Sequence, residues 1–273
     1  MTLMDPLQRQ QRGRDAQAKL TGTPVTEPST LLESSWPDFL FAEVWTRPGL
    51  DLRARYLISM SNGASGDTPT DILDGYVRGA LTQSLISISE LREAALHLAV
   101  YAGWSRGTAL DRAITRVARA LQLDEAPYPP LRDSAWDPAE RLKKGSVEFE
   151  RAMTFGGPPP AVAYFEAGIL NFVFGEMWHR DGLDQRSRRW ITLVGVADSS
   201  ATTPIQSHIY AAMASGNCSE AEMHEFVLQY AIHSGWPKAS FIQGVVFEMA
   251  KRVRDGLTWD GKPKESANDR TAK

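Results

Sequence analysis

The hydrophobic positions of this chain recur at three- and four-residue steps, and few stretches alternate at every second residue. One such series comprises Leu91, Ala94, Ala95, Leu98 and Ala99. That spacing places the apolar side chains on one face of a helix. Comparable patterns occupy residues 52–60, 108–121, 185–196 and 239–254. The patterning therefore predicts an all-α protein.

Two of the predicted helices begin with the same local signal. Residues 87–90 read Ser-Ile-Ser-Glu, and residues 219–222 read Ser-Glu-Ala-Glu. In such a capping box the serine oxygen accepts from an early helix N–H while the glutamate reaches back to the cap. Gly103 and Gly235 are placed to end the helices that follow.

A phrase near the start of the chain returns 133 residues later. Residues 43–58 and 176–191 are identical at nine of sixteen positions, including the Glu, Trp, Arg, Gly and Leu of "AEVWTRPGL" and "GEMWHRDGL". Residues 87–104 match residues 219–236 at an offset of 132. Such internal similarity indicates a duplicated structural unit. We interpret the chain as two tandem helical repeats.

The repeats and the proline- and glycine-rich stretches between them predict the domain organisation. Proline- and glycine-rich stretches, "APYPP" and "GGPPP", mark the segment between the copies, and both ends of the chain are polar. The expected parts are a flexible N-terminal tail (1–30), a first repeat (31–123), a linker with a lead-in helix (124–160), a second repeat (161–258) and a flexible C-terminal tail (259–273).

Composition narrows the class of protein. Apolar residues make up 42% of the chain and charged residues 23%, and the net charge of -3 provides no basic field for nucleic acid. The single cysteine, Cys218, excludes intramolecular disulfides and cysteine-based metal clusters. No apolar run reaches the roughly 18 residues that span a bilayer, and the N-terminus lacks a signal-peptide pattern. We expect a cytoplasmic protein with no membrane contact.

Several motifs together resemble the carboxymuconolactone decarboxylase family. In the first copy they are "AEVWTRPGLDLRAR", "YVRGAL" and "LHLAVYAGWSRG"; in the second they are "GEMWHRDGLDQRSR", "HIYAAM" and "LQYAIHSGWPKA". The resemblance covers residues 36–121 and 165–254. It implies an all-helical fold of the alkylhydroperoxidase D-like type, arranged around a three-fold axis. A two-copy chain would then assemble as a homotrimer that holds six repeats.

The resemblance also implies a reaction. It suggests a cofactor-independent carbon–carbon lyase of aromatic catabolism, similar to 4-carboxymuconolactone decarboxylase, whose substrate is a small carboxylated lactone or ring-cleavage product. No P-loop or glycine-rich dinucleotide motif is present, so we expect no cofactor. The thiol peroxidases of the same superfamily need a Cys-x-x-Cys pair. The corresponding slots hold Ala201 and Pro204 in one copy and Pro69 and Ile72 in the other, which excludes that chemistry.

The expected catalytic residues are His208, His233, Glu176 and Arg180. His208 occupies the slot of the family's "HVRGAL" histidine, and a histidine that titrates near neutrality can both take and return a proton. Tyr76 replaces it in the first copy, which leaves open whether the copies have specialised or share one site.

The expected substrate-binding residues come mainly from the first copy. They are Glu43, Trp45, Arg47, Tyr76, Arg78, His97, Tyr101 and, from the second copy, Trp178. Two alternatives stand beside this assignment: Glu43/Arg47 and Glu176/Arg180 have the i,i+4 spacing of surface ion pairs, and both tryptophans suit a core. Zinc-ligand spacing is absent, so we expect no metal. The alternative function is a non-catalytic assembly or ligand-binding protein, or a different proton-transfer enzyme.

Overall fold

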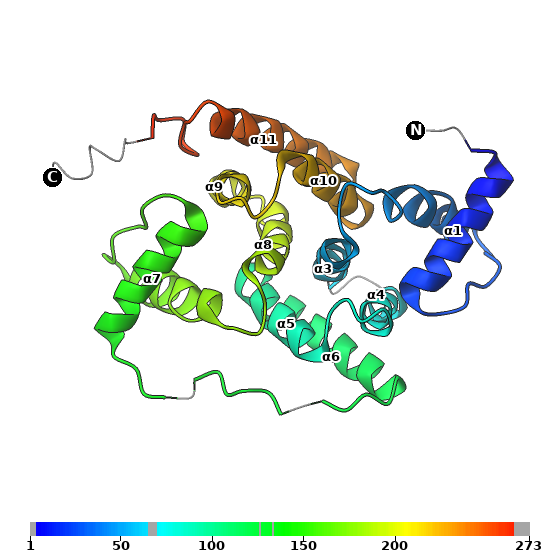
Figure 1. The fold of residues 1–273 in the computed structure, drawn as a ribbon, viewed down its shortest axis with the longest axis horizontal. Coiled ribbons are helices and arrows are strands. Elements are labelled where there is room, and N and C mark those ends of the chain that lie inside the picture. Colours follow the sequence, from blue (N-terminus) through cyan, green and yellow to red (C-terminus); the bar gives the residue numbers. More distant parts are fainter. Residues whose placement is uncertain (1–3, 65–69, 126, 133, 265–273) are drawn as a thin grey trace. The chain divides into compact units, whose positions relative to one another are not determined.

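The chain is helical throughout the part that its computed structural model describes, residues 4–64, 70–125, 127–132 and 134–264. These residues form no β-strand, only an isolated bridge between Leu257 and Pro263. The all-α prediction is confirmed. The helices, shown in Figure 1, are α1 (Pro6–Thr21), α2 (Leu31–Ser35), η1 (Trp36–Val44), α3 (Leu52–Gly63), α4 (Thr70–Thr82), α5 (Ile88–Ala102), α6 (Trp104–Ala120), α7 (Pro138–Met153), η2 (Tyr164–Phe174), η3 (Met177–His179), α8 (Gln185–Asp198), α9 (Thr202–Ala214), α10 (Glu220–Ser234) and α11 (Trp236–Arg254).

These helices form two compact units. Unit 1 comprises Met1–Tyr128 together with Glu225–Ala239, and unit 2 comprises Pro129–His224 together with Ser240–Lys273. The units do not follow the boundaries expected from the repeats, because residues 225–239 of the second copy belong to unit 1. No helix in the described part of the chain is long and apolar enough to cross a membrane.

Local sequence signals set the helix ends in unit 1. Asp51 caps α3 by accepting a hydrogen bond from the Ala54 N–H at 2.8 Å. The predicted capping box at the start of α5 is present, with both reciprocal bonds between Ser87 and Glu90. Helix α5 ends at Gly103, whose φ of 93° is a conformation that favours glycine, and α5 then packs against α6.

The expected flexible tail over residues 1–30 is wrong for Pro6–Thr21, which form helix α1. This helix packs against η1 and α4, as Figure 1 shows for the first pair. The contact depends on close backbone approach: a Cβ at Gly13 would lie 1.8 Å from the Pro37 carbonyl oxygen, and one at Gly79 would lie 1.7 Å from the Leu20 carbonyl oxygen. Helix α1 could not be predicted from an apolar stripe, because its packing depends on close backbone approach at glycines.

Unit 2 repeats several contacts of unit 1 at the offset read from the sequence. Arg53 donates to Glu90 at 2.7 Å in unit 1, and Arg186 donates to Glu222 at 2.7 Å in unit 2. Gly145 lies 132 residues after Gly13 and makes the same kind of approach, here between α7 and η2. These matched contacts agree with the tandem-repeat interpretation.

The expected C-terminal tail is also corrected at its beginning. The ring of Trp259 lies against Phe155, with centroids 5.8 Å apart, and the Trp259 carbonyl accepts a hydrogen bond from Arg252. Residues 265–273 of that expected tail lie outside the described residues.

Candidate functional site

Unit 1 brings together two titratable side chains from the two copies. The hydroxyl oxygen of Tyr76, on α4, lies 3.1 Å from Nε2 of His233, on α10, and the rings meet edge to face at 5.5 Å. Burial raises the pKa of Tyr76 and lowers the pKa of His233 to about 4. Near neutral pH the pair is therefore a protonated phenol beside an uncharged imidazole.

An aromatic wall lies behind this pair. The Trp45 ring stacks on Tyr76 with centroids 5.2 Å apart and meets Tyr56 edge-on at 5.0 Å. All three side chains are buried. Trp45 is thus part of the core, as one of the two alternatives had it, and it packs behind Tyr76.

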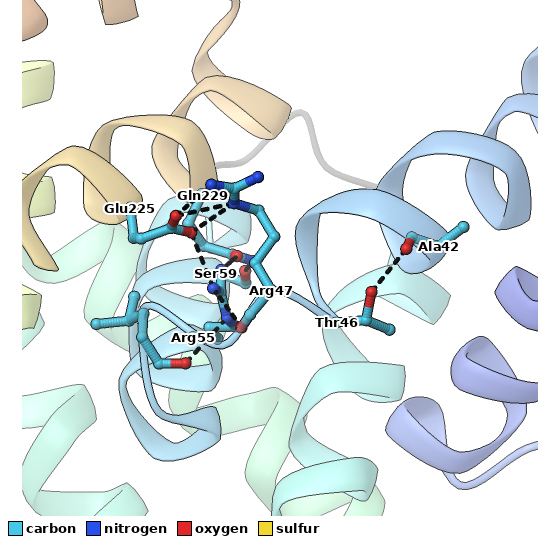
Figure 2. A network of polar contacts seen from close by, with 8 residues as sticks. Ala42, Thr46, Arg47, Arg55, Ser59, Glu225 and Gln229 are labelled. Atoms are coloured by element: carbon cyan, nitrogen blue, oxygen red, sulfur yellow. Dashed lines mark hydrogen bonds and ion pairs between the residues drawn. The ribbon is translucent and has the colours of Figure 1, made fainter. Parts of the chain in front are cut away.

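A buried charge network anchors the segment of α10 that carries His233 (Figure 2). The Arg47 guanidinium donates to both carboxylate oxygens of Glu225 at 2.6–2.9 Å, and Arg55 donates to the same carboxylate at 3.0 Å. Such bidentate, charge-assisted bonds fix orientation as well as position. Arg55 also donates to Gln229 at 2.7 Å, and Gln229 donates to Ser59 at 2.9 Å.

The network is electrostatically balanced. Burial alone would raise the pKa of Glu225, but the hydrogen bonds from Arg47 and Arg55 outweigh it and hold that pKa below its ordinary value. Burial lowers the pKa of Arg55, and Glu225 opposes that effect. Removing Glu225 would leave Arg55 as a fully buried cation without its counter-ion.

The sequence gives no signal for Arg55, which is missing from the expected site residues. Glu225, Gln229 and His233 recur every four residues and so share one face of α10, which makes Gln229 and His233 candidate pocket residues and places Glu225 on the same face. Gly49, from the repeated "RPGL" phrase, also contributes, because a Cβ there would lie 2.8 Å from Cγ of Glu225. The close approach of Glu225 to the backbone therefore explains the glycine of this phrase in the first copy.

A half-open cavity of about 380 Å³ lies beside Tyr76, among α1, η1 and α4. Tyr76 and Arg78 both line it, as does Ile72, which occupies one of the two former cysteine slots. The guanidinium of Arg78 makes no hydrogen bond or ion pair with any residue that the structure describes. The cavity therefore offers one available cation next to the Tyr76–His233 pair.

The expected i,i+4 ion pair between Glu43 and Arg47 is not formed. Glu43 pairs with Arg9 of α1 at 3.1 Å, while Arg47 turns to Glu225. The reason is that η1 ends at Val44, so the two residues do not share a regular helix. Glu176, the counterpart of Glu43 in unit 2, is buried and pairs with Arg141 of α7 at 2.6 Å.

His208 lies in unit 2 and is buried on α9. Burial, and secondarily the charge of Arg189, lowers its pKa to about 3. The near-neutral titration on which the sequence analysis based its catalytic role is therefore not found. Arg189 also stacks over the Trp178 ring, with its guanidinium carbon 4.9 Å from the ring centroid. Trp178, His208 and Arg189 thus gather in unit 2.

The remaining predicted residues lie elsewhere. His97 and Tyr101 contact each other on α5, with ring centroids 5.1 Å apart. Arg180 donates to the Leu131 carbonyl at 3.3 Å. A cavity of about 450 Å³ in unit 2 is lined in part by Arg141, whose charge is already used by Glu176. The described residues contain no group of three or more His, Cys, Asp or Glu that could hold a metal ion.

Unit 1 is thus all-helical and combines the Tyr76–His233 contact with a cavity that Arg78 lines, and comparison with known proteins adds the family. Residues 31–116 match the model of the carboxymuconolactone decarboxylase family, which confirms the resemblance over the first copy. The nitrosuccinic acid decarboxylase of Metarhizium robertsii is 37% identical over 81 residues, which are 30% of this chain and 53% of the relative. The match thus spans about half the length of that curated protein.

Proposed function

We propose that this chain catalyses the cofactor-independent decarboxylation of a small activated acid, and that the cavity of unit 1 is the reactive site. The observation that carries the proposal is the Tyr76–His233 contact beside a cavity that Arg78 also lines. The family match and the decarboxylase relative support the reaction class.

Decarboxylation makes three demands on a site. Breaking the carbon–carbon bond releases carbon dioxide and leaves the electron pair on the substrate, where a neighbouring carbonyl, lactone or nitro oxygen must accept it. A cation near that oxygen lowers the barrier, and an acid must then protonate the carbon. The total charge on the substrate stays the same until protonation. Arg78 is placed to stabilise the anion before and after bond cleavage.

Tyr76 supplies the proton in this scheme. Its raised pKa keeps the phenol protonated until a strongly basic carbanion forms beside it. Proton transfer from the hydroxyl to carbon forms the new C–H bond and leaves a tyrosinate. His233 is partly exposed, and a solvent proton returns to Tyr76 by way of its ring. Each turnover thus consumes one solvent proton and one carboxylate, and restores the enzyme.

A second candidate function, binding without catalysis, draws support from one observation. Tyr76 stands where the family motif places histidine, and a phenol is a weaker acid than an imidazolium. Under this reading the cavity holds a small acid and releases it unchanged. The two functions differ in one measurable product, carbon dioxide.

The assembly belongs to the same proposal. We infer two tandem family repeats in each chain, three chains in a ring, and a role in aromatic catabolism, as the motifs imply. The recurrence of the Arg53–Glu90 contact as Arg186–Glu222 supports the repeat. The trimer is a prediction, tested by light scattering on the purified chain, and a monomer would contradict it.

The experiment offers the purified chain several activated acids and follows carbon dioxide release above the spontaneous rate. Suitable substrates are enzymatically generated 4-carboxymuconolactone and nitrosuccinate, which carry two carboxylates each, and 2-nitropropanoate, which carries one. We expect multiple turnovers with at least one, and a loss of at least about 100-fold in Arg78→Gln. Arg119→Gln, which changes an exposed arginine on α6, is the matched control. Ligand binding without carbon dioxide release from any substrate would favour the binding function.

A further inference from the structure

The cavity of unit 1 lacks the two available cations that a ligand with two carboxylates would need. Arg78 is its available cation. Asp74 also lines the cavity but is neutralised by Arg116, which donates to it at 2.6 and 3.0 Å. Asp71 lines the cavity as well; it is exposed and makes no hydrogen bond or ion pair with the described residues. A second carboxylate on a ligand would therefore meet a carboxylate rather than a cation.

The part of the cavity wall formed by α1 carries an acceptor that favours a ligand with a hydrogen-bond donor. The side-chain oxygen of Gln17 is buried and has no hydrogen-bond partner among the described residues. An unsatisfied buried acceptor of this kind costs about 1–3 kcal/mol, and rotation of the Gln17 side chain toward a ligand donor in the cavity would remove that cost. The neighbouring hydroxyls of Thr21 and Thr23 are already paired with each other at 2.8 Å. Gln17 is thus the free polar group on this side.

Part of the cavity wall is aromatic. Trp36, Phe41 and Tyr76 line it, and Phe41 and Tyr76 are buried against Trp45. Flat aromatic side chains favour a flat ligand that stacks or packs edge-on. A volume of about 380 Å³ suits a single six-membered ring with short substituents.

We propose that this cavity selects a planar monocarboxylate that also carries a hydrogen-bond donor, with its anionic oxygens on Arg78 and its donor on Gln17. The inference deepens the proposed function by naming the substrate class: an acid with one carboxylate, which is the group lost. Arg78 then neutralises the one negative charge that passes from carboxylate to acceptor oxygen. Asp71 excludes dianions of the same size.

Unreactive aromatic acids test this selectivity without any turnover. Benzoate, 3-hydroxybenzoate and isophthalate share one ring and differ at one position, which bears hydrogen, hydroxyl or a second carboxylate. Dissociation constants are measured for each by isothermal titration calorimetry at pH 7.5 and low salt. We expect 3-hydroxybenzoate to bind more tightly than benzoate, and isophthalate to bind at least about tenfold more weakly than 3-hydroxybenzoate. Equal or tighter binding of isophthalate would overturn the proposal.

Variants assign each preference to a residue. Arg78→Gln should weaken all three ligands by at least about tenfold, whereas Arg119→Gln should change none. Asp71→Asn should improve isophthalate several-fold and leave benzoate unchanged, because it removes only the repulsion. Gln17→Leu should abolish the advantage of 3-hydroxybenzoate over benzoate. An Asp71→Asn variant that binds isophthalate no better contradicts the assigned role of Asp71.

These experiments test the monocarboxylate site and the decarboxylase function independently, so one proposal can fail while the other stands. Selective binding of 3-hydroxybenzoate without carbon dioxide release from any activated acid would sustain the monocarboxylate site and reject the decarboxylase. Carbon dioxide release with a preference for dicarboxylates would sustain the decarboxylase and reject the monocarboxylate site.

Discussion

The Tyr76 hydroxyl lies 3.1 Å from Nε2 of His233, although 157 residues separate them in the chain. The contact arises because residues 225–239, from the second copy, pack in unit 1 with the first copy. In the proposed site, residues of both copies therefore lie in one unit. The first copy supplies the phenol, the aromatic wall and Arg78, and the second supplies the imidazole together with the carboxylate that anchors its helix.

Two histidines, the buried His208 and the partly buried His233, make stability depend on pH. Burial lowers the pKa of His233 to about 4 and is the larger cause of the fall to about 3 for His208. Between pH 6.5 and these values the unfolded chain binds protons that the native chain does not, so the free energy of unfolding falls as the pH falls. The loss approaches about 3 kcal/mol per histidine at pH 4, and less for His233 because it is partly exposed.

Urea titrations at pH 7.5, 6, 5 and 4.5 measure this dependence. His208→Asn and His233→Asn should each flatten it, whereas His179→Asn, which changes an exposed histidine, should leave the slope unchanged. A slope that is the same in all four proteins would contradict the burial-driven pKa shifts.

Glu225 is expected to be a large single contributor to the stability of unit 1. Glu225→Ala leaves Arg55 buried without its counter-ion and should lower the free energy of unfolding by about 3–5 kcal/mol. Glu225→Gln keeps the shape of the side chain and should lower the free energy of unfolding by less than Glu225→Ala does. The control is Glu125→Ala, which breaks the more exposed pair with Arg92 and should cost no more than about 1 kcal/mol. Equal costs for Glu225→Ala and Glu125→Ala in urea unfolding would rule out the anchoring role.

Docking of α1 on η1 can be tested at one glycine. Gly13→Ala places a Cβ against the Pro37 carbonyl and should destabilise the protein by about 1–3 kcal/mol. Gly244→Ala, in α11, has open space around its Cβ and should be neutral or stabilising by up to about 1 kcal/mol. Amide hydrogen exchange should also show faster exchange in α1 for Gly13→Ala alone. Unchanged stability and exchange would mean that α1 is not docked.

Local sequence signals were sufficient for much of the fold. The capping boxes, the helix-ending glycines and the apolar periodicity all report on neighbours within a turn or two, so they predict helices and their ends. These signals do not predict helix α1, because it docks through the backbone at Gly13, where there is no side chain to form a pattern.

The site was less predictable for a related reason. Periodicity indicates which residues share a helix face, as it does for Glu225, Gln229 and His233, but it does not indicate which faces meet. The Arg47–Glu225 pair spans 178 residues, and its existence depends on how the copies fold together. The pKa of His208 likewise depends on burial and on Arg189, neither of which its own motif specifies.

The most direct test of the central claim compares carbon dioxide release by the wild type, Tyr76→Phe, His208→Ala and Tyr210→Phe on the best activated acid. Tyr76→Phe removes the proposed proton donor and should lower kcat by about 10²–10⁴-fold. Tyr210→Phe removes another buried hydroxyl, bonded to the Leu257 carbonyl, and should retain activity. The account predicts that His208→Ala, if folded, keeps most of its activity. Full activity in Tyr76→Phe together with loss in His208→Ala would place the chemistry in unit 2 and contradict the account.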